Sequence, residues 1–259
     1  MKITYFDEKL INEYIKIAKK NMFDLLRNGK SGHIGSSLSC IDILIVLYWI
    51  KYKQKRDVHI IISKGHAELA VYSAMKVFKQ ISSEKFKEIG SKLQGHPSKR
   101  WIKEIEYSSG SLGQGLSYAI GKAIAFSKDE VFVLLGDGEL QEGQVWEALI
   151  VGGRIKLSNL HIIIDYNKMQ LQGECLFPQE NSQLGRILYY LGYKVIEIDG
   201  HNTLDVHNAL KIKDKRPTIL IANTIKGNGI YYMENNADYH SKQLSEKEID
   251  RALNILNNN

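Results

Sequence analysis

Five short apolar runs constrain the fold of this chain more than any other feature of its sequence. They occupy residues 58–62, 131–135, 160–164, 193–198 and 218–222. Continuous apolar runs of this length are typical of strands that are buried on both faces of a parallel sheet. Segments with helical spacing of apolar residues lie between them, most clearly at 112–124 and 145–150. The alternation predicts an α/β fold in which a parallel β-sheet carries helices on both faces.

Both ends of the chain are predicted to be helical. Apolar residues recur at helical spacing from Leu10 to Leu26, and Asn28 and Gly29 supply a stop signal. Residues 245–259 are predicted to form a helix that frays into an asparagine-rich tail, within a C-terminal helical arm of about residues 240–259. With 44% hydrophobic residues, we expect residues 1–259 to form one domain around a large core.

The charge pattern favours a small anionic ligand over nucleic acid. The net charge is +6, and Lys and Arg are interleaved with Asp and Glu instead of gathering in one segment. The densest basic run, 51–56, is predicted to be a solvated loop. The longest apolar run, 41–50, reaches only about half of a membrane span and contains Asp42, so we expect a soluble protein with no membrane association.

The cysteine count points to a reducing compartment. Cys40 and Cys175 lie far apart, with no further cysteine to build a disulfide framework or a zinc site. Cys40 is predicted to be a small core residue. We therefore expect a cytoplasmic protein.

Two loops that follow neighbouring predicted strands carry the chemistry. Gly136-Asp137-Gly138 follows the run 131–135, and Asn167 lies thirty positions after Asp137, just beyond the next run. In parallel sheets, ligands bind beyond the carboxyl ends of the strands, so consecutive loops should bring Asp137 and Asn167 together. Either fragment alone indicates only a turn or a helix cap. Together, a carboxylate, an amide oxygen and a backbone carbonyl suit Mg²⁺ or Ca²⁺ beside a diphosphate.

The same spacing resembles the fingerprint of thiamine diphosphate enzymes, in which Gly-Asp-Gly is followed about thirty residues later by Asn. Further glycine- and histidine-bearing segments resemble the transketolase family in sequence and in order, over almost the whole chain. They are residues 31–35, 63–67, 95–97, 110–115 and 226–240. The resemblance implies the thiamine diphosphate-binding fold, and within it the domain that holds the diphosphate (the PP domain).

The resemblance also implies which residues hold the cofactor. The metal, Mg²⁺ or Ca²⁺, would be bound by the side chains of Asp137 and Asn167 and by the carbonyl of Met169. Thiamine diphosphate would be bound through its diphosphate, near the Gly136 turn, by the N–H of Gly138 and by two histidines, and through its aminopyrimidine by one backbone segment. These groups are His66 and His240 for the diphosphate, and Gly110, Ser111 and Leu112 for the aminopyrimidine.

For the reaction, the resemblance implies proton-handling residues beside the substrate. His33 and His96, with His240 nearby, would act on the hydroxyls of a sugar phosphate, which suits groups that titrate near neutrality. Glu142 would lie at a subunit boundary and link to cofactor activation in the partner site. No role is expected for the remaining histidines, His59, His161, His201 and His207, although His201 could still line the site.

A part of the catalytic machinery is missing from this chain. The family supplies an activating carboxylate from a pyrimidine-binding domain, which follows the diphosphate domain in full-length transketolases. We therefore expect a separate C-terminal subunit, a heterotetramer with two copies of each chain (α2β2), and no activity of this chain alone. The reaction would transfer a two-carbon ketol unit from a ketose phosphate to an aldose phosphate, with a pentose phosphate pathway role as the default.

Three alternatives remain open from the sequence. The same cofactor serves the α subunits of 2-oxo acid dehydrogenases and deoxyxylulose phosphate synthase, and a homologue can keep a fold without its activity. The Ser-Gly-His, Lys-Gly-His and Gly-His-Pro segments favour sugar chemistry. Ile34, where the family often has proline, and Asn228 depart from the common pattern, and Ile34 adjoins the expected substrate pocket.

Overall fold

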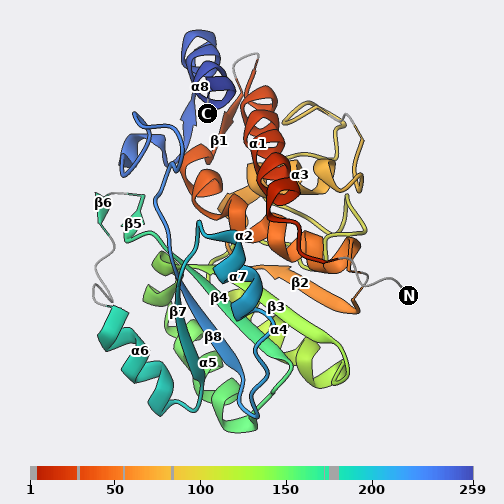
Figure 1. The fold of residues 1–259 in the computed structure, drawn as a ribbon, viewed down its shortest axis with the longest axis vertical. Coiled ribbons are helices and arrows are strands. Elements are labelled where there is room, and N and C mark those ends of the chain that lie inside the picture. Colours follow the sequence, from red (N-terminus) through yellow and green to blue (C-terminus); the bar gives the residue numbers. More distant parts are fainter. Residues whose placement is uncertain are drawn as a thin grey trace.

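A five-stranded parallel sheet forms the centre of the computed structural model, which describes residues 5–27, 30–54, 56–82, 85–171, 173–174 and 181–258 (Figure 1). The strand order is β2-β3-β4-β8-β7, and every neighbouring pair is parallel. The strands are β2 Val58–Ile62, β3 Glu130–Gly136, β4 Leu160–Tyr166, β7 Lys194–Asp199 and β8 Thr218–Asn223. They coincide with the five apolar runs to within two residues, so the predicted α/β fold is confirmed.

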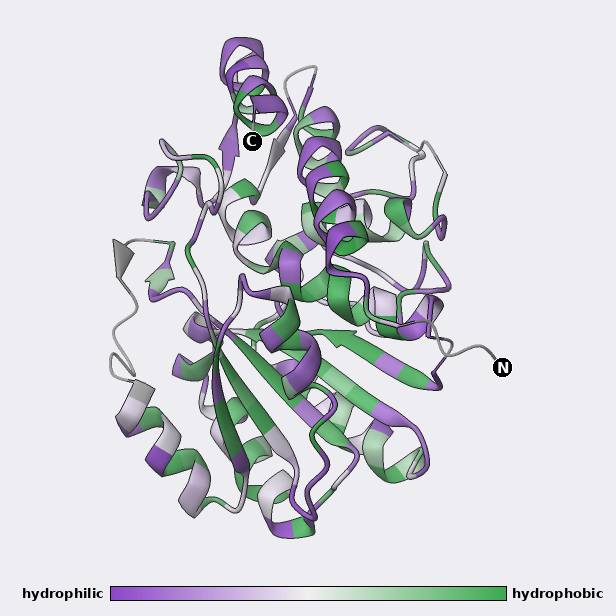
Figure 2. Cartoon of the chain, in the orientation of Figure 1, coloured by the Kyte–Doolittle hydropathy of each residue, from purple (hydrophilic) through white to green (hydrophobic). Residues whose placement is uncertain are grey.

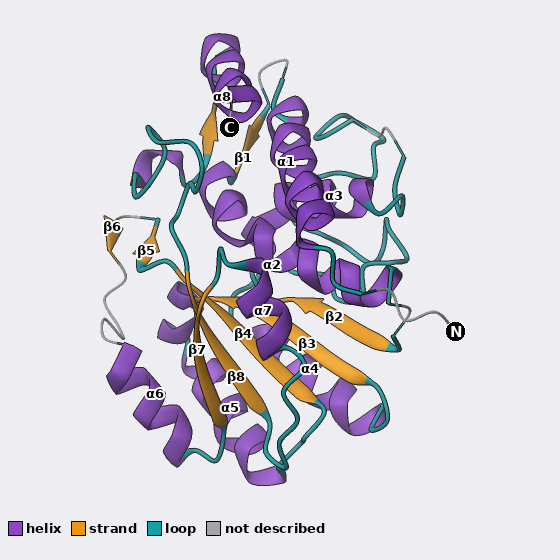
Figure 3. Cartoon of the chain, in the orientation of Figure 1, coloured by secondary structure: helices purple, strands orange, loops and turns teal. Residues whose placement is uncertain are grey.

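Helices cover both faces of this sheet (Figure 3). One face packs on α4 Gln114–Ala125, α5 Gly143–Ile155 and α6 Asn181–Tyr190, and the other on α1 Glu8–Leu25, α2 Ile34–Tyr52, α3 Glu68–Val77 and α7 Thr203–Ala209. Successive side chains of β3 enter opposite layers: Phe132 and Leu134 join the first core cluster, and Val131 and Val133 join the second. This double burial explains why the strands are apolar without alternation, as the hydropathy colouring shows (Figure 2).

Strand β7 departs from the expectation that all five runs are buried on both faces. It lies at the edge of the sheet, and its residues are half-buried or exposed. It contains the charged residues Lys194, Glu197 and Asp199, and its apolar residues Val195, Ile196 and Ile198 are only partly buried against the two clusters. An edge strand has a neighbour on one side only, so polar residues are tolerated there.

Helix α2 is the most buried helix of the layer formed by α1, α2, α3 and α7. It is the one helix among the described residues that is long and apolar enough, by length and composition, to cross a membrane, and 94% of that apolar window is buried inside the fold. Cys40 lies within it and is buried, as predicted. Cys175 lies outside the described residues.

The basic run at 51–56 is only partly the loop that we expected. Helix α2 continues to Tyr52, and Lys51 in its last turn is not a free solvated side chain, since its Nζ donates to Glu106 at 2.8 Å. The proposed stop at Asn28 and Gly29 lies outside the described residues, and α1 ends at Leu25.

The C-terminal segment is helical over a shorter stretch than the predicted arm. Helix α8 spans Glu246–Asn258 and is preceded by β9, Lys242–Gln243, which pairs antiparallel with β1, Ser31–Gly32. Residues 240–245 are therefore not helical, because part of them pairs with a strand near the start of the chain. The remaining short elements are η1 Gly65–Ala67, η2 Asp137–Gln141, β5 Met169–Gln170, β6 Gly173–Glu174 and η3 Ala237–Tyr239.

Candidate functional site

A cavity of about 480 Å³ lies beyond the carboxyl ends of β3 and β4, where the predicted loops meet. Most of the predicted site residues line it: His66, His96, Gly110, Leu112, Gly136, Asp137, Gly138, Glu142, Asn167, Met169 and His240. His33 and Ser111 do not line it directly. Ser111 is exposed, whereas His33 is half-buried and its ring lies next to those of His96 and His240.

Asp137 and the loop that carries Asn167 are joined by hydrogen bonds. The Asp137 carboxylate accepts from the backbone N–H of Gly138 at 2.8 Å and from that of Lys168. Lys168 has a left-handed backbone, with φ of 62°, which turns its N–H toward Asp137. The Asn167 Oδ1 atom accepts from the N–H of Met169 at 3.0 Å. The structure thus brings together the loops that contain the three predicted metal-binding groups.

Asp137 is a buried carboxylate that no described residue neutralises directly. It is 2% exposed and forms no ion pair within the described part of the chain. Burial and the nearby charge of Asp165 raise the pKa of Asp137 to about 7. The described residues contain no group of three or more His, Cys, Asp or Glu side chains that suits a metal. One carboxylate, one amide oxygen and one carbonyl fit a hard cation that keeps positions for phosphate oxygens, and such a cation would stabilise the Asp137 charge.

A buried ion pair underlies this pair of loops. Lys64 and Asp165 are 1% and 0% exposed, and their charged groups are in direct contact. Burial lowers the pKa of Lys64, but the Asp165 carboxylate more than offsets this, and the pKa is raised overall. Ser39 Oγ donates to Asp165 at 2.6 Å and accepts from Asn167 Nδ2 at 3.1 Å. The Asn167 amide is therefore fixed, with its nitrogen turned to the core and its oxygen toward the Met169 turn.

Glu139 joins three loops around the cavity. Its carboxylate, which is 0% exposed, accepts from Ser63 Oγ at 2.6 Å, from Gly113 N at 2.9 Å and from Gly136 N at 2.9 Å. Gly113 has φ of 80°, a conformation that glycine adopts without strain. The backbone at 110–113 is thereby tied to the loop after β3.

The four histidines to which the sequence assigned roles gather in one group. The ring centre of His33 lies 5.6 Å from that of His96 and 5.5 Å from that of His240, and His66 stacks on His240 at 5.5 Å. His66 lies in η1, His33 precedes α2, and His240 follows η3. The group is therefore assembled from four segments that are distant in sequence.

Glu68 orients His33. The Glu68 carboxylate is 1% exposed and lies 2.9 Å from His33 Nδ1, and it also accepts from the His33 backbone N–H at 3.0 Å. Nδ1 is the donor to an ionised carboxylate, so the neutral ring keeps Nε2 as an acceptor. Glu68 immediately follows the segment 63–67, but nothing in its spacing identified it.

Lys226 orients His240 and favours the other tautomer, with the ring proton on Nε2 instead of Nδ1. Its Nζ lies 2.8 Å from His240 Nδ1 and donates to the carbonyl of Gln170 at 3.2 Å. Burial and the charge of Lys64 lower the pKa of Lys226 to about 8, and burial and Lys226 lower the pKa of His240 to about 3. An ammonium can only donate, so His240 Nδ1 is the acceptor and Nε2 carries the proton. Burial also lowers the pKa of His66.

The histidines without an assigned role lie elsewhere. His59 contacts Glu106 and Asp129, His161 is buried in β4 beside Glu130, and His207 stacks on Phe6. His201 lines a different cavity and is bonded to Asp42. Glu142 is exposed at the rim of the site.

The fold and the site together define an α/β domain that presents a carboxylate, an amide and a histidine cluster at one edge of a parallel sheet. The family model described as the thiamine diphosphate binding domain of transketolase matches residues 10–259. The chain therefore belongs to the transketolase family.

Similar proteins include both single subunits and full-length enzymes. One of the subunits of apulose-4-phosphate transketolase from Phocaeicola vulgatus is 33% identical over 252 residues, which cover 91% of this chain and 89% of that protein. The 6-deoxy-6-sulfo-D-fructose transketolase subunit SqwG of a Clostridium species is 34% identical, with 86% and 87% covered. Human transketolase is 33% identical over 86% of this chain but only 38% of its own length.

The solved structure of transketolase from Campylobacter jejuni has the same fold. It superposes with a TM-score of 0.84 at 27% identity over 97% of this chain. The matched region makes up 43% of the Campylobacter chain. This protein thus spans about two-fifths of the full-length enzymes and nearly all of the subunits that it resembles.

Proposed function

We propose that this chain is the thiamine diphosphate-binding subunit of a transketolase whose remaining part is a separate chain. The observation that carries the proposal is the meeting of Asp137 and Asn167 at neighbouring strand ends, beside the cluster of His33, His66, His96 and His240. Support comes also from the relatives that are named as single subunits of a transketolase, whose length matches that of this chain. The 2-oxo acid dehydrogenase, deoxyxylulose phosphate synthase and non-catalytic alternatives are not favoured by these relatives.

For the cofactor, the residues present offer a consistent set of donors. The side chains of Asp137 and Asn167 and the carbonyl of Met169 would hold Mg²⁺, the ion that most often accompanies a diphosphate. The N–H of Gly138 and the Nε2–H of His240 would donate to diphosphate oxygens, with His66 beside them. When bound, thiamine diphosphate supplies the electron sink for cleavage of a carbon–carbon bond. The protein supplies placement and hydrogen bonds.

For the sugar, His33 and His96 would handle protons. Because Glu68 holds the proton of His33 on Nδ1, Nε2 can accept a proton from a substrate hydroxyl and return it. His96 is exposed at the mouth of the cavity, where an incoming sugar phosphate would meet it. The donor is proposed to be a ketose phosphate and the acceptor an aldose phosphate.

A partner subunit would complete the site. We propose that it contributes a pyrimidine-binding domain with the activating carboxylate, and that two copies of each chain assemble. Glu142, exposed at the rim, would lie at the boundary between them. The cysteine content is the basis for proposing a cytoplasmic location.

The proposal is tested by reconstitution. Thiamine diphosphate and Mg²⁺ should raise the melting temperature of this chain when a C-terminal transketolase subunit of the same organism is present, as measured by thermal shift. The mixture should transfer ketol groups among a panel of ketose and aldose phosphates, and this chain alone should not. Transfer by this chain alone would rule out the two-subunit proposal. Decarboxylation of a 2-oxo acid without any transfer would reassign the enzyme class.

A further inference from the structure

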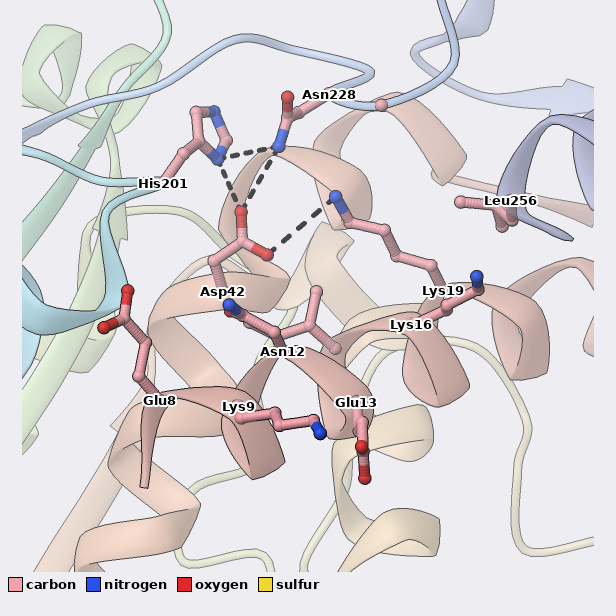
Figure 4. A pocket seen from close by; sticks show the side chains of 12 residues that line it. Glu8, Lys9, Asn12, Glu13, Lys16, Lys19, Asp42, His201, Asn228 and Leu256 are labelled. Atoms are coloured by element: carbon pink, nitrogen blue, oxygen red, sulfur yellow. Dashed lines mark hydrogen bonds and ion pairs between the residues drawn. The ribbon is translucent and has the colours of Figure 1, made fainter. Parts of the chain in front are cut away.

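A second cavity, of about 750 Å³, lies between α1 and the loop that carries Lys226, outside the candidate active site (Figure 4). Asp42 from α2, His201 from the turn after β7, and Asn228 meet at its floor, with Lys19 from α1 beside them. Asp42 is 3% exposed and Lys19 is 8% exposed. These residues form a buried polar cluster that is separate from the candidate active site.

The hydrogen bonds of His201 determine where its proton lies. The backbone N–H of Ile225 donates to His201 Nε2 at 2.8 Å. A backbone N–H can only donate, so Nε2 carries no proton in this contact. The proton is on Nδ1, which lies 2.6 Å from Asp42 Oδ2 and donates to it. Asn228 Nδ2 donates to the same oxygen at 3.3 Å. It also lies 2.9 Å from His201 Nδ1, a contact that is not a hydrogen bond while Nδ1 carries the proton, because an amide nitrogen can only donate. Asp42 thus holds the His201 ring in one tautomer and one orientation.

Ile225, whose N–H is bound by His201, is adjacent in sequence to an active-site residue. Ile225 precedes Lys226, whose Nζ lies 2.8 Å from His240 Nδ1. The next anchor of this loop is Gly227, whose N–H donates to the carbonyl of Gly35 at 3.0 Å. The carbonyl of Lys226 itself accepts from the N–H of Asn235 at 2.9 Å. Several contacts therefore hold the backbone around Lys226, and His201 provides the one at Ile225.

We propose that His201, oriented by Asp42, is a positioning residue of the active site. It holds Ile225 so that Lys226 points at His240 Nδ1 and His240 presents Nε2–H to the cofactor cavity. The consequence for cofactor binding rests on the proposed function, whereas the tautomer of His240 does not. His201 does not line the cofactor cavity, so its effect is transmitted through its contacts with the loop that carries Lys226, at the Ile225 amide and at Asn228.

Two substitutions separate the contacts of His201. In His201→Gln, the side-chain amide reaches about as far as Nε2, and its oxygen can still accept from Ile225. In His201→Asn, the amide reaches only the position of Nδ1, so the contact with Asp42 is kept and that with Ile225 is lost. Asp42→Ala should also weaken the contact between His201 and Ile225, because the His201 ring can rotate once its partner carboxylate is removed. His207→Asn is the control, since His207 is buried on α7 against Phe6, away from the cavity.

The primary measurement is ¹⁵N NMR of the His240 ring in the full chain without ligand. The native protein, His201→Gln and His207→Asn should show the proton on Nε2 alone, and His201→Asn and Asp42→Ala should show a mixture of tautomers. Thiamine diphosphate affinity of the reconstituted enzyme should fall about tenfold in His201→Asn, as for the loss of one hydrogen bond to a charged ligand, and by less than about threefold in His201→Gln.

An unchanged His240 spectrum in both His201→Asn and Asp42→Ala would overturn the proposal, as would an equal change in His207→Asn. If the native reconstituted enzyme binds no thiamine diphosphate, the proposed function fails, but the NMR result still decides whether His201 positions the Lys226–His240 pair.

Discussion

The ammonium group of Lys64 is paired with the carboxylate of Asp165 in a part of the core that solvent hardly reaches. Asp165 also accepts from Ser39, and Ser39 accepts from Asn167. One buried ion pair therefore supports the amide that we propose as a metal ligand. Both the stability of the fold and the geometry of the site depend on it.

Replacing Lys64 by Met should destabilise the protein strongly. The substitution leaves the Asp165 carboxylate buried without its counter-ion, a change that typically costs about 3–5 kcal/mol. Urea unfolding followed by circular dichroism measures the loss. The matched control is Lys213→Met, because the Lys213 side chain is 60% exposed and Glu130 keeps Arg56 and His161 as partners, so the loss should be less than about 1 kcal/mol. Equal losses in the two variants would contradict the role given to Lys64.

Asp137 should make the metal-free protein less stable as the pH rises. Its folded-state pKa, raised to about 7 by burial and by Asp165, exceeds that of the unfolded chain, near 4. The folded state thus binds the proton more tightly between about pH 4 and pH 7. Stability falls across this window, by an amount on the order of 4 kcal/mol, and the deficit is complete above it.

Asp137→Asn removes this dependence. Without metal, the variant should be about as stable as the native protein near pH 4 and more stable near pH 8, by an amount on the order of 4 kcal/mol, as measured by urea unfolding at both values. With Mg²⁺ and thiamine diphosphate the order should reverse, because the variant has lost the proposed metal ligand. If the native protein and the variant show the same pH dependence of unfolding, the inference that Asp137 is a buried carboxylate with a raised pKa is wrong.

Glu68→Gln should slow the reaction without lowering the affinity for thiamine diphosphate. The neutral amide holds His33 less firmly in the tautomer that leaves Nε2 as an acceptor, and residues that orient a functional histidine typically contribute about 10- to 100-fold. We expect kcat of the reconstituted enzyme to fall by such a factor, with thiamine diphosphate affinity unchanged. Glu106→Gln is the control, because Glu106 holds His59 in a similar pair at 2.5 Å outside the site. An equal effect of both variants would argue against a role for Glu68 in catalysis.

Two helical glycines should respond in opposite directions to alanine. A Cβ at Gly153 in α5 would overlap the carbonyl oxygen of Leu191, so Gly153→Ala should destabilise by about 1–3 kcal/mol or more. A Cβ at Gly121 in α4 meets no atom within 4 Å, so Gly121→Ala should stabilise by about 0.5–1 kcal/mol through the helix propensity of alanine. Thermal unfolding of both variants checks the pair.

The sequence predicted the sheet well because each strand carries its own signal. A buried parallel strand is apolar over its whole length, and this pattern is local. Strand β7 was predicted as a strand but not as an edge, since edge position depends on which strands pair. In the same way, pairing of residues 242–243 with 31–32 depends on distant partners, so the predicted arm was too long.

The site was predicted unevenly for a similar reason. Asp137 and the four clustered histidines lie in glycine-bearing segments, and Asn167 follows Asp137 by thirty residues, so their spacing is visible along the chain. Lys64, Glu68, Glu139 and Asp165 act through what they touch, and most of their partners are more than twenty residues away, among them His33, Gly113 and Ser39. The sequence assigns no role to His201 beyond the alternative that it lines the site, because its contacts with Asp42 and Ile225 exist only in the folded chain.

The packing of α8 on α1 has a consequence for how the protein is made. Arg27, just after α1, contacts Glu246 at 2.7 Å and Asp250 at 3.0 Å on α8, and apolar residues of both helices share one core cluster. During synthesis α1 leaves the ribosome first, whereas α8 follows every strand of the sheet. Part of the apolar face of α1 therefore stays exposed to solvent until α8 has been synthesised and packs against it. Nascent chains that stall before α8 should be targets for chaperones and proteases.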